Sequence, residues 1–402
     1  MLRVKIRKVS YKAVSVKKLL KDMRTYSSLM TDLAYTAFLY NNKQLAKEVM
    51  RLEELVDYAS YLLLMNAALA VRDKDDAEQM AGIMKVASAV DTISNAAADI
   101  ANLVLLGVSA HPLVDYVFEK TDETVEVFEV KNHNFAGRTL QSLDLESKLG
   151  VNIIAVRKSG KWIVNPSDDL KLDAGDRLIA RGSLESIDNM ERIFGSTLDE
   201  EEKIVREVSK NPVWKKIGSM IEQLKDTTEF IIDLAYSALI FNSKSLAEEV
   251  LKLEDYIDTL HTEYELEILK ETDLIAESPK PSLGLLRLGI ATENMADGAA
   301  LMSEITMRGL EAHPILKEVV QEGEEIIFAV RVSEESSLSN KKLGDTDIPT
   351  LGAKVIAVRR DKKWYFKPGD DFVIEPNDVL IISAYSDTKR TIYLMAKQQL
   401  SI

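Results

Sequence analysis

The sequence predicts an α+β multidomain protein in which two three-helix bundles alternate with two small α+β domains. A long repeat and a change of sequence texture inside each copy support this prediction. The segment 32–57, DLAYTAFLYNNKQLAKEVMRLEELVD, returns at 233–258 as DLAYSALIFNSKSLAEEVLKLEDYID. A period of roughly two hundred residues is too long for a solenoid unit, so we interpret it as a duplication. We therefore expect four domains, at 1–110, 111–197, 198–312 and 313–402.

The first part of each copy has the composition of long helices. Residues 14–107 contain almost no Gly or Pro and are rich in Ala, Leu, Met, Glu and Lys. Apolar side chains recur every three or four residues, which is typical of a helix with one buried face. We expect helices over 15–40 and 43–71, with a break at Asn41-Asn42, and a third helix capped by Asp73. Three such helices predict an up-down-up bundle.

The second part of each copy has the pattern of short strands. TVEVFEV alternates apolar and polar residues, VNIIAV is β-branched, KWIV follows a Ser-Gly turn, and DRLIARG completes the set. We expect one sheet with a helix over 184–194 packed on it. The second half repeats the order, with helices expected over 213–241, 244–276 and 283–310 and a proline-bearing turn at 278–281. The strands EIIFAVRV, KVIAV, KWYF and DVLIISA follow.

Composition excludes several functional classes. The 402 residues include 65 acidic and 51 basic side chains, a net charge of −14, which argues against nucleic acid as a partner. The absence of cysteine excludes disulfides, thiolate metal sites and cysteine nucleophiles, and favours a cytoplasmic location. The longest apolar runs are about half the ~20 residues that a membrane-spanning helix needs. No Ser-His-Asp order, His-Glu-x-x-His or Walker motif supports a hydrolase or kinase.

Two families resemble these repeats. The Asp-Leu-Ala-Tyr segment and VASAVDTISNAAADIANLV resemble the PhoU family of helical regulators. The sheet segments, with LGVNIIAVR, LGAKVIAVR and NPSDD, resemble the TrkA C-terminal domain, also called the RCK C-terminal domain. The resemblance implies a non-enzymatic regulator of potassium or phosphate transport that contacts a transporter or its regulator. It also implies metal binding by acidic motifs, and cyclic di-AMP binding between two C-terminal domains. No Gly-x-Gly-x-x-Gly follows a predicted strand, so NAD binding is not carried over.

Acidic rows on the second and third helices of each bundle are candidates for a metal site. Carboxylates at i and i+4 share a helical face and repel each other, and a divalent cation reverses that effect. The family motif falls on Glu53, Asp57, Asp91, Asn95 and Asp99 in the first copy, and on Glu254, Asp258, Glu293 and Asp297 in the second. Leu301 stands where the first copy has Asp99. Divalent or transition metal ions would suit these oxygen donors, and a merely solvated helix face is the alternative.

Other polar residues stand out by their surroundings. Asp32 and Asp233 lie in apolar helix segments, where an unpaired carboxylate is costly, so each needs a partner. We expect a structural hydrogen bond to a Tyr, a Lys or a helix end, and a role in ligand binding is the alternative. His111 and His313 each precede a Pro between a bundle and a sheet domain, where we expect a capping or hinge role.

Two positions in each sheet domain are candidates for holding a phosphate. Arg157 and Pro166 in the first copy correspond to Arg359 and Pro368 in the second, which places positive charge beside a proline-bearing loop. A strand end that simply faces solvent is the alternative. Two such domains in one chain are compatible with a monomer containing an internal pseudo-dimer or with a homodimer.

The leading hypothesis is therefore a cytoplasmic regulator of ion transport that binds metal, a small nucleotide, or both. A metal-dependent enzyme or a metal-storage bundle using the acidic rows is the first alternative, and a scaffold that binds only protein is the second.

Overall fold

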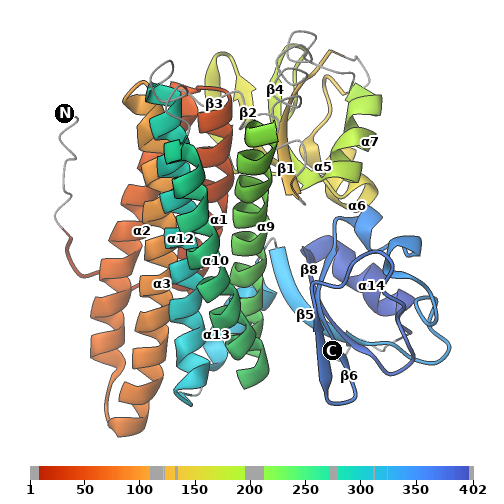
Figure 1. The fold of residues 1–402 in the computed structure, drawn as a ribbon. Coiled ribbons are helices and arrows are strands. Elements are labelled where there is room, and N and C mark those ends of the chain that lie inside the picture. Colours follow the sequence, from red (N-terminus) through yellow and green to blue (C-terminus); the bar gives the residue numbers. More distant parts are fainter. Residues whose placement is uncertain are drawn as a thin grey trace.

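In the described part of the chain, six long helices form one side of the structure, and two small sheet domains lie beside them, one above the other (Figure 1). The computed structural model describes residues 9–108, 121, 123–131, 135–194, 212–270, 279–310, 313–323 and 325–397. The long helices are α1 (Val16–Leu39), α2 (Lys43–Ala70), α3 (Lys74–Leu105), α9 (Pro212–Ile240), α10 (Lys244–Lys270) and α12 (Pro279–Met307). The predicted boundaries near 110, 197 and 312 fall on residues outside these ranges and stay predictions.

Local signals set the helix ends as the sequence predicts. Asn41 adopts a positive φ of 45°, and the Asn42 side chain accepts hydrogen bonds from the first backbone amides of α2. Asp73 caps α3 by accepting from the amide of Asp76. The break between α1 and α2 and the cap of α3 are therefore confirmed.

The two bundles share one hydrophobic core. Helices α3 and α12 run against each other, and the buried residues of all six helices belong to a single cluster. Gly298 permits this approach, because a Cβ there would lie 2.6 Å from Cγ1 of Ile93 and 3.0 Å from the carbonyl oxygen of Ala89. The bundles are consequently a continuous six-helix block.

Each sheet has four antiparallel strands. Their orders are β1-β4-β2-β3 and β5-β8-β6-β7, and both sheets have a register shift in the same place, at Ile153/Ala155 and Val355/Ala357. The strands are β1 (Glu123–Glu129), β2 (Asn152–Lys158), β3 (Lys161–Val164), β4 (Arg177–Ser183), β5 (Glu325–Arg331), β6 (Lys354–Arg360), β7 (Lys363–Phe366) and β8 (Val379–Tyr385). Shared topology and a shared bulge agree with a duplication.

Each sheet packs on the helical block and also has a core of its own. Ile179 of β4 and Ile381 of β8 belong to the helical core, whereas Leu178 and Leu380 belong to the separate cores of the two sheet domains. Helices α5 (Leu140–Leu143), α6 (Leu145–Leu149), α7 (Leu184–Phe194) and α14 (Lys389–Met395) complete these domains. The predicted helix over 184–194 is confirmed.

The two sheet domains touch each other through a pair of glycines. Gly150 ends α6 and Gly352 ends the 3-10 helix η2 (Pro349–Leu351), with φ of 66° and 64°. A Cβ on Gly150 would lie 2.4 Å from the amide nitrogen of Gly352. Corresponding positions of the two copies thus meet, as expected for an internal pseudo-dimer.

Two local predictions need correction. The prolines at 279 and 281 do not form a turn, because α12 begins at Pro279 and a proline in the first helical turn removes no intrahelical hydrogen bond. The short helix α13 (Pro314–Gln321), whose N-cap is His313, was not predicted. Its Nδ1 accepts from the amide of Ile315 at 3.1 Å, which confirms the capping role of His313. His111 lies outside the described residues.

Candidate functional site

Three carboxylates gather where α10 faces α12. Glu254 and Asp258 lie on α10 and Asp297 on α12, and each offers an oxygen within 4.8 Å of the others. The four-residue spacing places Glu254 and Asp258 on one face of α10, and the antiparallel neighbour supplies the third group. Of the predicted residues of the second copy, the structure brings these three together, with Glu293 one turn before Asp297.

Glu254, Asp297 and the neighbouring Glu293 hold their protons more tightly than free carboxyls do. Burial, and next the charge of Asp258, raises the pKa of Glu254 to about 7, and the protonated Glu254 shares a hydrogen bond with Asp297. Burial and then Asp297 raise the pKa of Glu293 to about 7. Burial also raises the pKa of Asp297. At neutral pH Glu254 and Glu293 can therefore release their protons when a cation binds.

The first copy has a weaker form of this arrangement. The pKa of Glu53 is raised by burial, then by Asp57, and Asp91 on α3 contributes as well. The pKa of Asp91 is raised by burial and by Asp57, while Asn95 donates a hydrogen bond to it at 3.3 Å. The two predicted helices do face each other here, but an amide replaces one carboxylate. Asp99 is exposed.

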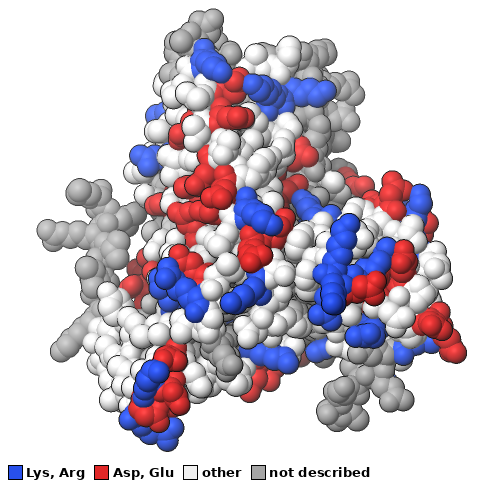
Figure 2. Space-filling view, turned by 60° about the horizontal axis from the view of Figure 1, so that its bottom comes forward, with Lys and Arg blue, Asp and Glu red and all other residues white. Residues whose placement is uncertain are grey.

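These donors fit a metal ion by their chemistry. Carboxylate oxygens from two helices suit cations that take several oxygen ligands, and besides burial, which is the larger cause, the raised pKa values of Glu254 and Glu293 reflect repulsion that a cation would relieve. Figure 2 shows acidic side chains gathered along the helical part of the face it presents, with basic side chains among them. A bound cation would neutralise charge locally within a protein of net charge −14.

A second candidate region is a cavity of about 570 Å³ between the helical block and the sheet domains. Helices α1 and α9 line one side, β4 and Gly150 contribute from the first sheet domain, and the second sheet domain supplies most of the remaining wall. Its basic lining residues are Arg24, Arg181, Lys354 and Lys367, and its acidic ones are Asp32, Glu229, Asp233, Glu325 and Asp370. A volume of this size suits a small organic ligand.

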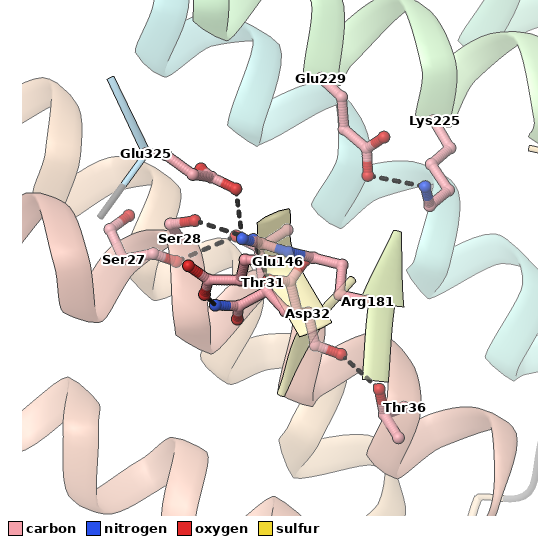
Figure 3. A network of polar contacts seen from close by, with 11 residues as sticks. Ser27, Ser28, Thr31, Asp32, Thr36, Glu146, Arg181, Lys225, Glu229 and Glu325 are labelled. Carbon is pink, nitrogen blue, oxygen red and sulfur yellow. Dashed lines mark hydrogen bonds and ion pairs between the residues drawn. The ribbon is translucent and has the colours of Figure 1, made fainter. Parts of the chain in front are cut away.

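Arg181 is the centre of a buried polar network beside the cavity (Figure 3). Its guanidinium donates to Asp32 of α1 at 2.6 Å and to Glu325 of β5, and its side chain is 9% exposed. Ser28 lies 3.4 Å from the same guanidinium. One side chain of the first sheet thus joins the first bundle to the second sheet domain.

The partner that the sequence demanded for Asp32 is therefore an arginine from another domain. Arg181 was not predicted as this partner, although a charged residue inside the apolar strand segment LIARG is a signal in the sequence. Asp233, the counterpart of Asp32, also lines the cavity. Ser383 stands where the first copy has Arg181, so the two copies differ at this position.

The cavity includes one of the four residues predicted to bind a phosphate. Pro368 lines it, whereas Arg157, Pro166 and Arg359 are not among its lining residues. Arg359 is exposed and stacks on Trp364, with 5.7 Å from its guanidinium carbon to the ring centroid.

Lys158 follows Arg157, and Arg360 follows Arg359. Each of these two basic residues forms ion pairs within its own sheet domain. Lys158 binds Asp173 and Asp176, and Arg360 binds Asp378 at 2.8 Å. Asp378 is completely buried. Lys158 and Arg360 therefore form equivalent ion pairs between a strand end and a loop, whereas phosphate binding by Arg157, Pro166, Arg359 and Pro368 stays a prediction.

Comparisons with known proteins agree with this architecture. The family model of the PhoU domain matches residues 20–104 and 221–306, and that of the TrkA-C domain matches 125–195 and 327–394. The Ktr system potassium uptake protein C of Bacillus subtilis (strain 168) is 32% identical over 102 residues, which are 25% of this chain and 46% of the relative. The chain thus spans less than half the length of that curated relative.

Among solved structures, PhoU from Pseudomonas aeruginosa is 12% identical, with a TM-score of 0.40 over 73% of this chain and 96% of its own. The RCK C domain of the potassium transport protein KtrA, in complex with cyclic diadenosine monophosphate, is 25% identical over 20% of this chain and 94% of its own, with a TM-score of 0.18. In the described parts of the chain, no helix is both long and apolar enough to cross a membrane. The chain therefore contains two PhoU domains and two TrkA-C domains, which alternate along its length.

Proposed function

We propose that this chain regulates ion transport, with a potassium uptake system as its first candidate partner and a phosphate transporter as the second. It would act in the cytoplasm by contact with the transporter or its regulator, and not by catalysis. The observation that carries the proposal is the pairing of PhoU and TrkA-C domains on one chain. The match to a protein named for potassium uptake supports the first partner.

The helical block is proposed to sense a cation. Glu254, Asp258 and Asp297 form the site in the second bundle, supported by Glu293, and Glu53, Asp57 and Asp91 form a weaker counterpart. The bound ion would remove the repulsion between α10 and α12 and so tighten their packing. A transporter contact that depends on this packing would then respond to the ion.

The cavity is proposed to receive cyclic di-AMP. Its basic lining residues Arg24, Arg181, Lys354 and Lys367 suit the two phosphates of such a ligand, and apolar side chains including Ile348 and Pro349 suit its bases. Residues of both helical bundles and both sheet domains line this cavity, so a ligand bound there would contact both halves of the duplicated chain.

Co-purification tests the transporter contact. The tagged protein is incubated with detergent-solubilised membranes of its source organism and recovered by its tag. Mass spectrometry should find a potassium or phosphate transport protein enriched relative to the same procedure with untagged protein. Enrichment of neither kind of transporter would contradict the proposed partner.

A melting experiment tests the nucleotide. Saturating cyclic di-AMP should raise the melting temperature of the wild-type protein, because a ligand that binds only the folded state stabilises it. Lys354→Gln should reduce this shift, whereas the matched variant Arg157→Gln, outside the cavity lining, should keep it. An unshifted wild-type protein would rule out cyclic di-AMP as the ligand.

A further inference from the structure

A buried ion pair extends from the cavity into the boundary between the two bundles. Glu229 of α9 lines the cavity, and its Oε1 atom lies 2.7 Å from Nζ of Lys225, one turn earlier on the same helix. The side chain of Lys225 is 6% exposed, so the stability of its charge depends on partners inside the protein. Figure 3 shows this pair together with the network of Arg181, which also lines the cavity. A charged ligand next to Glu229 would therefore act on Lys225 as well.

Lys225 in turn contacts a tyrosine of the first bundle. Its Nζ lies 5.9 Å from the ring centroid of Tyr35 on α1, within the range of a cation–π contact. The hydroxyl oxygen of Tyr35 lies 3.1 Å from Oγ1 of Thr292 on α12, and both side chains are buried. Thr292 donates its one hydroxyl proton to the carbonyl oxygen of Leu288 at 2.9 Å, so Tyr35 is the donor toward Thr292. Glu229, Lys225, Tyr35 and Thr292 thus form a polar path from the cavity to α12.

The polar path reaches α12 at the turn that carries the acidic site. Glu293 is the residue after Thr292, and Asp297 follows one turn later. The hydroxyl of Thr228 on α9 lies 3.5 Å from the carbonyl oxygen of Thr292, so both α1 and α9 contact this position. A threonine hydroxyl bonded to the carbonyl four residues earlier often bends a helix. A shift of Tyr35 would consequently change how α12 presents Glu293 and Asp297 to α10.

The other half of the pseudo-symmetric block differs at the end of this path. Val90 of α3 stands where α12 has Thr292, and valine has no hydroxyl to accept a hydrogen bond. Tyr236, the counterpart of Tyr35, does have a cation over its ring, since the guanidinium carbon of Arg24 lies 5.1 Å from the centroid. The last contact of the path therefore forms toward the bundle with the three-carboxylate cluster and cannot form toward α3.

We propose that the polar path couples the two proposed sites, so that a ligand in the cavity raises the cation affinity of the second bundle. By thermodynamic reciprocity the cation then raises the affinity for the ligand. Each ligand would order the same buried groups, and the second one to bind would lose less conformational entropy in ordering them. The inference rests on the proposed cation binding by Glu254, Asp258 and Asp297 and on the proposed nucleotide in the cavity. Tyr35 and Thr292 are positioning residues, because neither belongs to the carboxylate cluster or to the cavity lining.

Calorimetric titration of chelator-treated full-length protein with Mn²⁺, with and without saturating cyclic di-AMP, tests the coupling. The wild-type protein should bind Mn²⁺ at least about fivefold more tightly with the nucleotide, which is the low end of typical couplings. Tyr35→Phe and Thr292→Val each remove one hydroxyl of the polar path, so both should bring this factor close to one and still bind Mn²⁺. Thr306→Val is the matched control and should keep the factor, because Thr306 is also a buried threonine of α12 but bonds the carbonyl oxygen of Ala238.

A second readout does not depend on the identity of the nucleotide. The protein has no cysteine, so Ser383→Cys introduces a unique thiol in the wall of the cavity. Saturating Mn²⁺ should slow the alkylation of this thiol by iodoacetamide, because a more ordered cavity opens less often. The combination of Ser383→Cys with Tyr35→Phe should be alkylated at the same rate with and without Mn²⁺.

The outcomes separate this inference from the proposed function. Equal Mn²⁺ affinity with and without cyclic di-AMP, in a protein that binds both, would overturn the coupling and leave both sites in place. A coupling that persists in Tyr35→Phe and Thr292→Val would overturn the role of the polar path. If cyclic di-AMP does not bind, an alkylation rate that Mn²⁺ leaves unchanged would overturn the coupling. No binding of Mn²⁺ by the wild-type protein would overturn this inference, while the cation site would still be decided by titration with other ions.

Discussion

Arg181 of the first sheet donates a hydrogen bond to Asp32 of the first bundle at 2.6 Å, and the pair is almost completely buried. The same guanidinium binds Glu325 of the second sheet domain. Loss of the guanidinium charge leaves the Asp32 carboxylate, whose side chain is 14% exposed, in a poorly solvated place. We expect Arg181→Met to lower the free energy of unfolding by about 3–5 kcal/mol, measured by denaturant titration.

Arg177 is the matched control for this prediction. It lies on the same strand but is exposed, so Arg177→Met should change the free energy of unfolding by less than about 1 kcal/mol. Equal effects of the two substitutions would show that the buried network does not hold the domains together.

The contact between Gly150 and Gly352 predicts a second difference. Gly150→Ala adds a Cβ that would lie 2.4 Å from the backbone of Gly352, so the two sheet domains must move apart. Gly160→Ala suffers a comparable strain, because φ is +81°, but its Cβ meets nothing within 4 Å. We expect Gly160→Ala to cost about 1–2 kcal/mol and Gly150→Ala clearly more, with a larger radius of gyration in solution scattering.

If Gly150→Ala leaves both the scattering profile and the stability at the level of Gly160→Ala, the close approach of the two sheet domains would be wrong. The comparison is informative because both positions demand a left-handed backbone and differ mainly in their surroundings.

The raised pKa values predict how stability depends on pH. Folding raises the pKa of Glu254 and Glu293 from 4.5 to about 7, so between these values the folded state binds more protons than the unfolded state. The free energy of unfolding contributed by these groups therefore falls as pH rises from 4.5 to 7. Metal-free protein should lose less stability over this range in the Glu293→Gln variant, as followed by thermal melting.

Added metal should reverse this trend, because deprotonated carboxylates bind cations best and metal binding increases as pH rises. An identical pH profile for wild-type protein and Glu293→Gln would contradict the assigned origin of the shift.

Much of the fold was predictable because its signals are local. The repeat, the apolar periodicity of α1 to α3, the Asn42 and Asp73 caps and the alternation in β1 depend on neighbours in the sequence. The facing of Glu53 and Asp91 was also predictable, since both lie on adjacent antiparallel helices. Whether these residues bind metal stays a prediction.

The contacts between domains were not predictable in the same way. The partner of Asp32 is 149 residues away, on a strand whose position depends on how two domains pack. Arg157 and Arg359 were chosen for their charge, but the cavity is lined by other basic residues. Long-range packing, and not residue type, decided these cases.

The central claim is that the second bundle binds a cation through Glu254, Asp258 and Asp297. Calorimetric titration of chelator-treated protein with Mg²⁺, Ca²⁺, Mn²⁺, Fe²⁺ and Zn²⁺ tests it most directly. The account predicts saturable heat with at least one of these ions in the wild-type protein, and a much weaker response in the Asp258→Asn variant. No heat above buffer for any ion, or an unchanged titration in Asp258→Asn, would contradict it.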